Sequence, residues 1–356
     1  MGSEMCIRDR YTSTAKAVTG RRRGDRIVHL STLTATLCLA AAAPSAPATS
    51  EFIALPGGPP VGMDYLAYDA VTARLWVPAG NTGRVDVLDT RSGKLEVIDH
   101  VPTAKRGERS VGASAATVGD GVAYVGNRAD STVCAFDAKS LAHRGCITLS
   151  SSPDGLAYVA TTKEVWVTTP KDLSVAVLDV KGTGAPRLGG TVKFEGKPEG
   201  YAVDAQRGIF YTNLEDKDRT VAVDVHTRQV VATWKPGCGE AGPRGLALDE
   251  GRRQLFVACT DRIKTLDATN GVLLSELATG GGVDNIDYLP SRRLVYAASG
   301  KEARLTVAVV GNDGALKLAS TSQTVEGCRT VVVDSAGAAY LPDSRGGRLV
   351  VVRPAR

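Results

Sequence analysis

Histidine is scarce in this sequence, with only 4 in 356 residues, and no Cys-x-x-Cys-His motif occurs. The absence of that motif excludes covalent attachment of a c-type haem. His100, His143 and His226 are dispersed along the chain, and none is expected beside a serine or cysteine as a Ser–His–Asp triad requires. The sequence therefore contains no candidate nucleophilic catalytic site.

Helical patterning is also missing. After residue 48, no stretch of ten residues carries apolar side chains at the three-and-four spacing of an amphipathic helix. The mildly apolar run Ile27–Ala43 is too short, and too rich in Ser and Thr, for a membrane span. The hydrophobic fraction of 43% is ordinary for a globular protein and excludes wholesale disorder. The chain is expected to be a folded domain without a membrane-spanning segment.

Residues 1–48 differ in composition from the rest of the chain. Arginines at 21–23 and 26 precede the apolar run, and Ala46-Pro47-Ala48 forms a small-x-small site. This order predicts a signal peptide and export to the periplasm or the medium. Residues before about 20 fit no signal and are interpreted as a mis-called or non-native leader. Lipidation at Cys38 is disfavoured because Leu37 stands where lipoproteins have a small residue.

The net charge of +5 belongs mostly to this leader. Without residues 1–48 the chain keeps 36 basic and 35 acidic residues. Non-specific nucleic-acid binding needs a basic surface that displaces counterions. A nucleic-acid partner is therefore not expected.

Aromatic residues make up only 5% of the chain, but their positions repeat. One aromatic recurs inside a short apolar run at intervals of 40 to 48 residues; the seven positions are Trp76, Tyr124, Trp166, Phe210, Phe256, Tyr296 and Tyr340. Each is preceded and followed by further β-branched runs, with Gly, Asp, Asn and Pro in the gaps. Four short strands per unit and seven units predict an all-β, seven-bladed β-propeller of residues 49–356.

The predicted blades are residues 57–108, 109–150, 151–195, 196–243, 244–282, 283–326 and 327–356. The last unit holds only three strands before the chain stops. Glu51–Leu55 is a strand-like segment without a unit of its own. We expect this segment to be the outer strand of the seventh blade, so that no incomplete blade exposes an open edge.

These repeats resemble the YVTN-repeat β-propellers, the YncE-like proteins. The resemblance is carried by Phe210-Tyr211-Thr212-Asn213, by Tyr124-Val125-Gly126-Asn127, and by Pro-x-Gly starts at Pro153, Pro198 and Pro243. It covers about residues 51–356 and implies export. Similar propellers occur in binding proteins, dehydrogenase subunits and lyases, so the resemblance indicates architecture more than activity.

The start of the first strand in each blade is expected at the mouth of the central channel. Counting 11 or 12 residues back from each aromatic gives seven mouth positions: Asp64, Gly112 or Ala113, Asp154, Glu199, Arg244, Asp284 and Arg329. Six of these are charged, whereas average composition would make about a quarter charged. The set is either a solvated rim of turn residues or a polar binding site for a small ligand or a partner protein.

Two functions follow from these alternatives. The first is an exported, monomeric, non-catalytic binding or scaffold propeller without a cofactor. The second is a metal-dependent hydrolase or lyase, because propeller lactonases hold calcium through Glu, Asn and Asp side chains. Its candidate ligands are Asp154, Glu199, Asp284 and Asn285, the last being the only asparagine expected near the mouth.

Five cysteines follow the leader, so at least one is unpaired within a monomer. Cys134 and Cys146 flank a predicted hairpin turn and are expected to face each other across an antiparallel pair. Cys238, entering the fifth blade, and Cys259, ending its second strand, are expected on the same face. Cys328 is then the odd thiol. The alternative is five buried free cysteines that pack as small hydrophobes.

Overall fold

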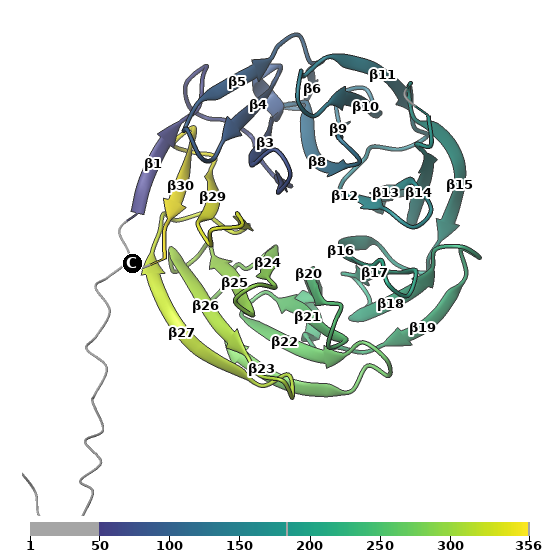
Figure 1. The fold of residues 1–356 in the computed structure, drawn as a ribbon, viewed down its shortest axis with the longest axis vertical. Helices are drawn as coiled ribbons and strands as arrows, with labels where there is room; N and C mark the ends of the chain where they lie inside the picture. Colours follow the sequence, from purple (N-terminus) through teal and green to yellow (C-terminus); the bar gives the residue numbers. More distant parts are fainter. Residues whose placement is uncertain (1–49, 183, 355–356) are drawn as a thin grey trace, which may run out of the picture. The chain divides into compact units, whose positions relative to one another are not determined.

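The computed structural model describes residues 50–182 and 184–354. The predicted leader, residues 1–48, lies outside the described residues. The described chain is all-β, with seven four-stranded antiparallel sheets arranged in a ring (Figure 1). The prediction of a seven-bladed propeller is confirmed. Among the described residues, no helix is long and apolar enough to cross a membrane.

Each blade is one sheet whose strands follow one another from the inside of the ring outward. Blade 1 contains β2 (Ala67–Asp69), β3 (Arg74–Ala79), β4 (Arg84–Asp89) and β5 (Leu95–Ile98). Blade 2 contains β8 (Ala113–Gly119), β9 (Val122–Asn127), β10 (Thr132–Asp137) and β11 (His143–Thr148). Blade 3 contains β12 (Leu156–Val159), β13 (Glu164–Thr169), β14 (Ser174–Asp179) and β15 (Arg187–Lys193).

The next three blades repeat this order. Blade 4 contains β16 (Pro198–Asp204), β17 (Ile209–Leu214), β18 (Arg219–Asp224) and β19 (Val230–Trp234). Blade 5 contains β20 (Pro243–Asp249), β21 (Gln254–Cys259), β22 (Arg262–Asp267) and β23 (Leu273–Ala278). Blade 6 contains β24 (Ile286–Leu289), β25 (Leu294–Ser299), β26 (Arg304–Val310) and β27 (Leu316–Gln323).

Blade 7 combines both ends of the described chain. It contains β28 (Val332–Val333), β29 (Ala339–Asp343), β30 (Arg348–Val352) and, outermost, β1 (Ser50–Ala54). β1 runs antiparallel to β30, with Ser50 opposite Val352 and Ala54 opposite Arg348. Leu55, which follows β1, is buried in an apolar cluster between blades 7 and 1. The first and last strands of the domain are therefore hydrogen-bonded neighbours.

Aromatic side chains on the second strands fill the spaces between blades. Trp76, Trp166, Phe210 and Phe256 are fully buried. The ring of Trp166 in blade 3 lies 4.8 Å from that of Phe210 in blade 4, measured between centroids. Tilted and stacked pairs of this kind add to the stabilisation from buried apolar area. The scarce aromatics are concentrated where neighbouring blades pack together.

The aspartate that ends many third strands closes the following turn. Oδ1 of Asp137 accepts hydrogen bonds from the backbone N–H groups of Lys139 and Ser140, at 3.0 and 2.7 Å. Oδ1 of Asp224 does the same in blade 4. These are Asx turns, in which a carboxylate satisfies backbone donors that the strands leave free. The recurring Asp therefore has a structural role.

Two details differ from the sequence-based expectation. The innermost strands are short in blades 1, 3, 6 and 7, so Asp64, Asp154, Asp284 and Arg329 precede the strands instead of beginning them. An additional hairpin, β6 (Ala104–Arg106) and β7 (Arg109–Val111), lies between blades 1 and 2. The described residues also form three single-turn 3₁₀ helices: η1 (Gly80–Thr82), η2 (Pro170–Asp172) and η3 (Gly239–Ala241).

Candidate functional site

The channel mouth is the end of the ring where each inner strand begins and each second strand finishes. Antiparallel pairing places these two points together. The backbone N–H of Asp154 donates to Thr168 O at 2.9 Å, and that of Glu215 donates to Lys197 O at 3.0 Å. Residues just after the second strands therefore lie beside the predicted mouth residues.

Arg128 joins two mouth carboxylates. It follows β9 and lies partly buried, and its Nη2 donates to Asp64 Oδ2 at 2.7 Å and also to Asp154 Oδ1. Burial raises the pKa of Asp154 to about 6, despite the opposing effect of Arg128. Burial alone would lower the pKa of Arg128, but the charges of Asp64 and Asp154 outweigh it, and the pKa is raised. The guanidinium thus holds blades 1, 2 and 3 together at the channel entrance.

Two more arginines pair with acids on the other side of the mouth. Arg329 Nε lies 3.2 Å from Asp284 Oδ2, and its Nη2 lies 4.0 Å from Asp64 Oδ1. Arg244 pairs with Glu215, which follows β17. Burial, the largest cause, raises the pKa of Asp284. Most mouth carboxylates therefore have an arginine partner.

Glu199 differs from these acids. Among the ion pairs of the described residues, none includes Glu199; its Oε1 instead accepts a hydrogen bond from the hydroxyl of Tyr65 at 2.9 Å. Its pKa is raised to about 8, chiefly by burial and then by the charges of Asp154 and Asp284. Tyr65 is itself buried, and its own pKa is raised above the ordinary value. Among the four predicted mouth carboxyls, Glu199 is therefore the one that is desolvated and has no arginine partner.

The channel continues below the mouth as a cavity of about 330 Å³. Its walls include Tyr65 of blade 1, Tyr201 of blade 4, and Asn285 and Asp287 of blade 6. Asp287 accepts hydrogen bonds from the backbone N–H of Val333 at 2.7 Å and of Tyr288 at 2.8 Å. Burial nevertheless raises its pKa to about 6. The cavity is therefore lined in part by polar groups.

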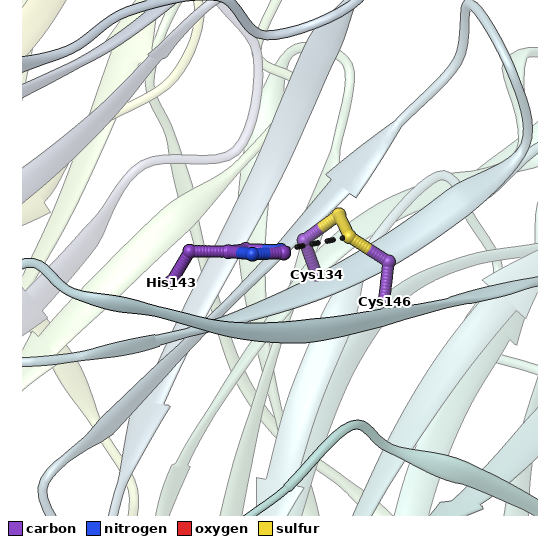
Figure 2. Close-up of side chains that lie close together, drawn as sticks. All are labelled: Cys134, His143 and Cys146. Carbon is purple, nitrogen blue, oxygen red and sulfur yellow. Dashed lines mark hydrogen bonds between the residues drawn. A yellow bond between two sulfur atoms is a disulfide. The ribbon is translucent and has the colours of Figure 1, made fainter.

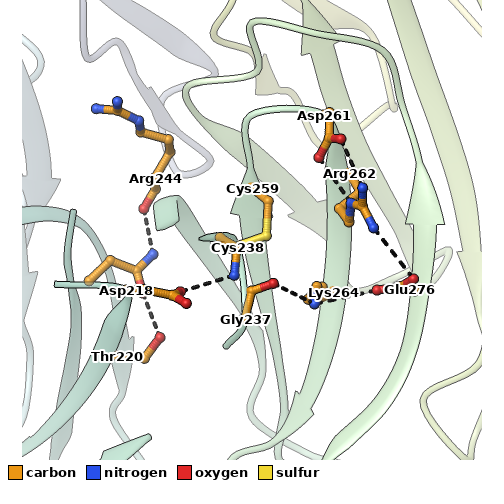
Figure 3. Close-up of a disulfide and its surroundings, with 11 residues drawn as sticks. Asp218, Thr220, Gly237, Cys238, Arg244, Cys259, Asp261, Arg262, Lys264 and Glu276 are labelled. Carbon is orange, nitrogen blue, oxygen red and sulfur yellow. Dashed lines mark hydrogen bonds and ion pairs between the residues drawn. A yellow bond between two sulfur atoms is a disulfide. The ribbon is translucent and has the colours of Figure 1, made fainter. Parts of the chain in front are cut away.

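A disulfide shapes the loop that leads to Arg244. Cys238 and Cys259 are bonded, and Figure 3 shows this bridge between the loop entering blade 5 and the end of β21. The Cys238 N–H donates to Asp218 Oδ1 at 3.0 Å, and Lys264 Nζ donates to Gly237 O at 2.9 Å. These contacts fix the backbone a few residues before the mouth.

The structure places all six charged mouth residues around the channel entrance. Gly112 contributes only its carbonyl, which accepts from the N–H of Arg128 at 2.9 Å. The predicted set of mouth residues did not include Arg128, Glu215 or Tyr65. Arg128 and Glu215 directly follow the second strands, at one or two residues after the asparagines of the repeat motif, and this spacing would have found them.

One expectation about the mouth is wrong, because Asn285 is not the only asparagine there. Asn213 Nδ2 donates to the backbone carbonyl of Arg244, at the beginning of the neighbouring blade, at 2.5 Å. Its Oδ1 accepts from the hydroxyl of Thr220 at 2.7 Å, so both ends of the buried amide are satisfied by protein. Asn213 therefore serves to link two blades.

The positions of the mouth carboxylates in this structure do not form a calcium site. Calcium takes six to eight oxygen ligands at about 2.3–2.6 Å. In the part of the chain that the structure describes, the one group of three Asp, Glu, His or Cys side chains with ligand atoms within 4.8 Å of one another is Cys134, His143 and Cys146. Asp154 and Asp284 are instead engaged by arginines.

Comparisons with known proteins agree on the fold. No family model and no curated protein matches the chain. A chain from a crystal structure of the mitotic checkpoint complex is 14% identical, with a TM-score of 0.72, over 93% of this chain and 99% of that one. Hydrazine synthase of Kuenenia stuttgartiensis is 13% identical, with a TM-score of 0.68, over 84% and 97%. A streptogramin B lyase is 13% identical, with a TM-score of 0.69, over 86% and 97%. At these identities the likeness shows the β-propeller alone.

Proposed function

We propose that this protein is a non-catalytic, ligand-binding propeller whose channel mouth takes a small cationic ligand, such as a protonated amine, at Glu199. One observation carries the proposal: Glu199 is a desolvated carboxyl that Tyr65 orients and that no arginine neutralises. Burying a charge without a partner is costly. A cation seated beside Glu199 would supply the missing partner, while Arg128, Arg244 and Arg329 hold the remaining acids.

Proton release follows from this arrangement. The pKa of Glu199, about 8, keeps the carboxyl mostly protonated at pH 7. A bound cation favours the carboxylate and lowers that pKa, because opposite charges stabilise each other. Binding at pH 7 should therefore release a proton. Calorimetry in buffers of different ionisation heats measures the number of protons released on binding.

A thermal-shift screen with primary, quaternary ammonium and guanidinium compounds tests the proposal. A binding compound should raise the melting temperature of the parent protein but not that of Glu199→Gln, which keeps the shape and loses the charge. Glu276→Gln, on the outer strand β23, is the matched control and should respond like the parent. No shift with any compound, or an equal shift in Glu199→Gln, contradicts the proposal.

Export and family membership belong to the same proposal. Two disulfides in the described chain support an oxidising compartment, such as the periplasm or the medium, since disulfides are rare in the cytosol. The YVTN-repeat motifs support a place among the YncE-like propellers. The near-neutral charge after residue 48 argues against nucleic acid as the partner. We propose a monomer that takes a small molecule or a protein segment at its mouth.

A second candidate function is a lyase or hydrolase. A carboxyl with a pKa of about 8, hydrogen-bonded to a tyrosine hydroxyl, is protonated at neutral pH and is suited to act as a general acid. Turnover of a lactone or ester panel that disappears in Glu199→Gln, with retained folding, would favour this function over simple binding. Metal content of the purified protein, with Asp284→Ala as comparison, tests whether calcium takes part.

A further inference from the structure

The second disulfide lies far from the mouth, on the outer strands of blade 2, beside a histidine. Cys134 of β10 pairs with Cys146 of β11, and their Cα atoms are 4.0 Å apart. His143 Nε2 lies 3.2 Å from Cys146 Sγ (Figure 2). The imidazole nitrogen and the two sulfurs all lie within 4.8 Å of one another. These are three side chains that bind zinc in proteins.

A β-bulge creates this juxtaposition. Residues three apart on a strand normally point to opposite faces, because side chains alternate. In β11 the register shifts so that Cys146 opposes Cys134, Gly145 opposes Ala135, and His143 opposes Phe136. Arg144 is the additional residue, and Gly145 supplies the positive φ of 125°. His143 therefore shares a face with both cysteines.

The other blades show that the fold alone does not require these residues. The same register shift occurs between the third and fourth strands of blades 3, 4, 5 and 6. There the position of His143 is taken by exposed apolar residues: Leu188, Val230, Leu273 and Leu318. The positions of the two cysteines hold pairs without sulfur, such as Val221 with Thr233. Blade 2 alone combines two thiols and an imidazole at this place among the blades that share the shift.

The site is also accessible. Cys146 and His143 are exposed, and Cys134 is partly exposed. They line a hollow of about 360 Å³ together with His100 and Pro102 from the loop that leaves blade 1. The other disulfide is more protected, since Cys259 is only 1% exposed. A soluble reductant should therefore open Cys134–Cys146 first, because exchange requires access to sulfur.

We propose that Cys134, Cys146 and His143 form a zinc site when their disulfide is reduced. A dithiol reductant supplies two electrons and two protons, yielding two protein thiols and the reductant's own disulfide. Zn²⁺ then displaces the two thiol protons to solvent and binds both thiolates and the neutral His143 Nε2. The exposed position leaves the fourth tetrahedral place to water. A small disulfide oxidant takes two electrons from the thiolates, is itself reduced to two thiols with protons from solvent, and re-forms Cys134–Cys146 with release of Zn²⁺, so binding follows the redox state.

Rotation of the cysteine side chains can bring the two sulfurs to the separation that zinc needs. Thiolates at about 2.3 Å from a tetrahedral zinc are about 3.8 Å apart. Opposed cysteines on neighbouring strands can reach that separation by changing χ1 while the backbone ladder stays intact. The proposal is independent of the mouth site, which lies on the inner strands.

Zinc titration of the full-length protein tests the proposal. The protein is reduced with dithiothreitol without oxygen, freed of reductant, and titrated with Zn²⁺ against a chromophoric chelator. The reduced parent should bind one zinc per chain at this site, and the oxidised parent none. With Co²⁺ in place of zinc, reduced protein should show thiolate-to-cobalt charge-transfer absorption and tetrahedral d–d bands.

Matched variants separate this site from other sulfurs. His143→Ala should weaken zinc binding at least about 10- to 100-fold, the loss typical for even an outer partner of a metal ligand. Cys134→Ser with Cys146→Ser should abolish it, whereas Cys238→Ser with Cys259→Ser should retain it. His226→Ala, which removes an exposed histidine in a turn of blade 4, is the control for His143→Ala. Zinc binding that is absent, unchanged by His143→Ala, or dependent on Cys238 and Cys259 overturns the proposal.

Discussion

Replacing Glu199 by glutamine should stabilise the protein, and the gain should grow with pH. The pKa of Glu199 rises from an ordinary value of 4.5 to about 8 in the folded state, mainly through burial. Between these values the folded chain holds a proton that the unfolded chain has lost. Stability therefore falls as pH rises across this window and levels off above about pH 8.

The size of the effect follows from the shift. Each pKa unit corresponds to about 1.4 kcal/mol, so the ionised form costs up to about 5 kcal/mol at high pH. Glutamine carries no titrating proton and can still accept the hydrogen bond from Tyr65. Parent and Glu199→Gln should be nearly equally stable at pH 5. The variant should be several kcal/mol more stable at pH 9.

Chemical denaturation of both proteins at five pH values between 5 and 9 measures this difference. Glu276→Gln, whose carboxylate pairs with Lys264 at 3.4 Å on an outer strand, is the control and should show no growing gain. A difference that stays constant with pH would refute the reasoning. A parent that is more stable than Glu199→Gln at pH 9 would mean that the carboxylate has a cationic partner.

Three further perturbations address the fold and the mouth. Deleting residues 51–55 should lower the denaturation midpoint of the whole domain, because it removes the strand beside β30 and the buried Leu55; an unchanged midpoint would contradict this. Trp166→Ala should cost about 3–5 kcal/mol of unfolding free energy, since the ring is fully buried between two blades, and a loss below about 1 kcal/mol would be inconsistent with that packing. Arg128→Met should destabilise more at pH 8 than at pH 5, because Asp154, with its pKa raised to about 6, ionises between these pH values and then lacks its cation; equal losses at both pH values would argue against the clamp.

Much of the channel mouth could be predicted by counting. A repeat fixes the position of each inner strand relative to its aromatic residue, so Asp154, Glu199 and Arg244 were placed at the entrance without any structure. Arg128 was overlooked because the count followed the first strands only. The second strands return to the same end, and their final residues complete the site.

The pattern of side chains along each strand determined the number of blades, the order of strands and the location of the polar mouth. These features depend on local alternation, turn residues and chain length, which a sequence displays directly. Which carboxylate lacks a cation was decided only by the tertiary structure, since Arg128 reaches Asp64 and Asp154 from another blade while Glu199 meets Tyr65. The bulge that places His143 beside Cys146 likewise depends on the register between β10 and β11, which only the folded structure shows. Burial and charge pairing arise between residues far apart in the chain, so their balance exists only once the ring has closed.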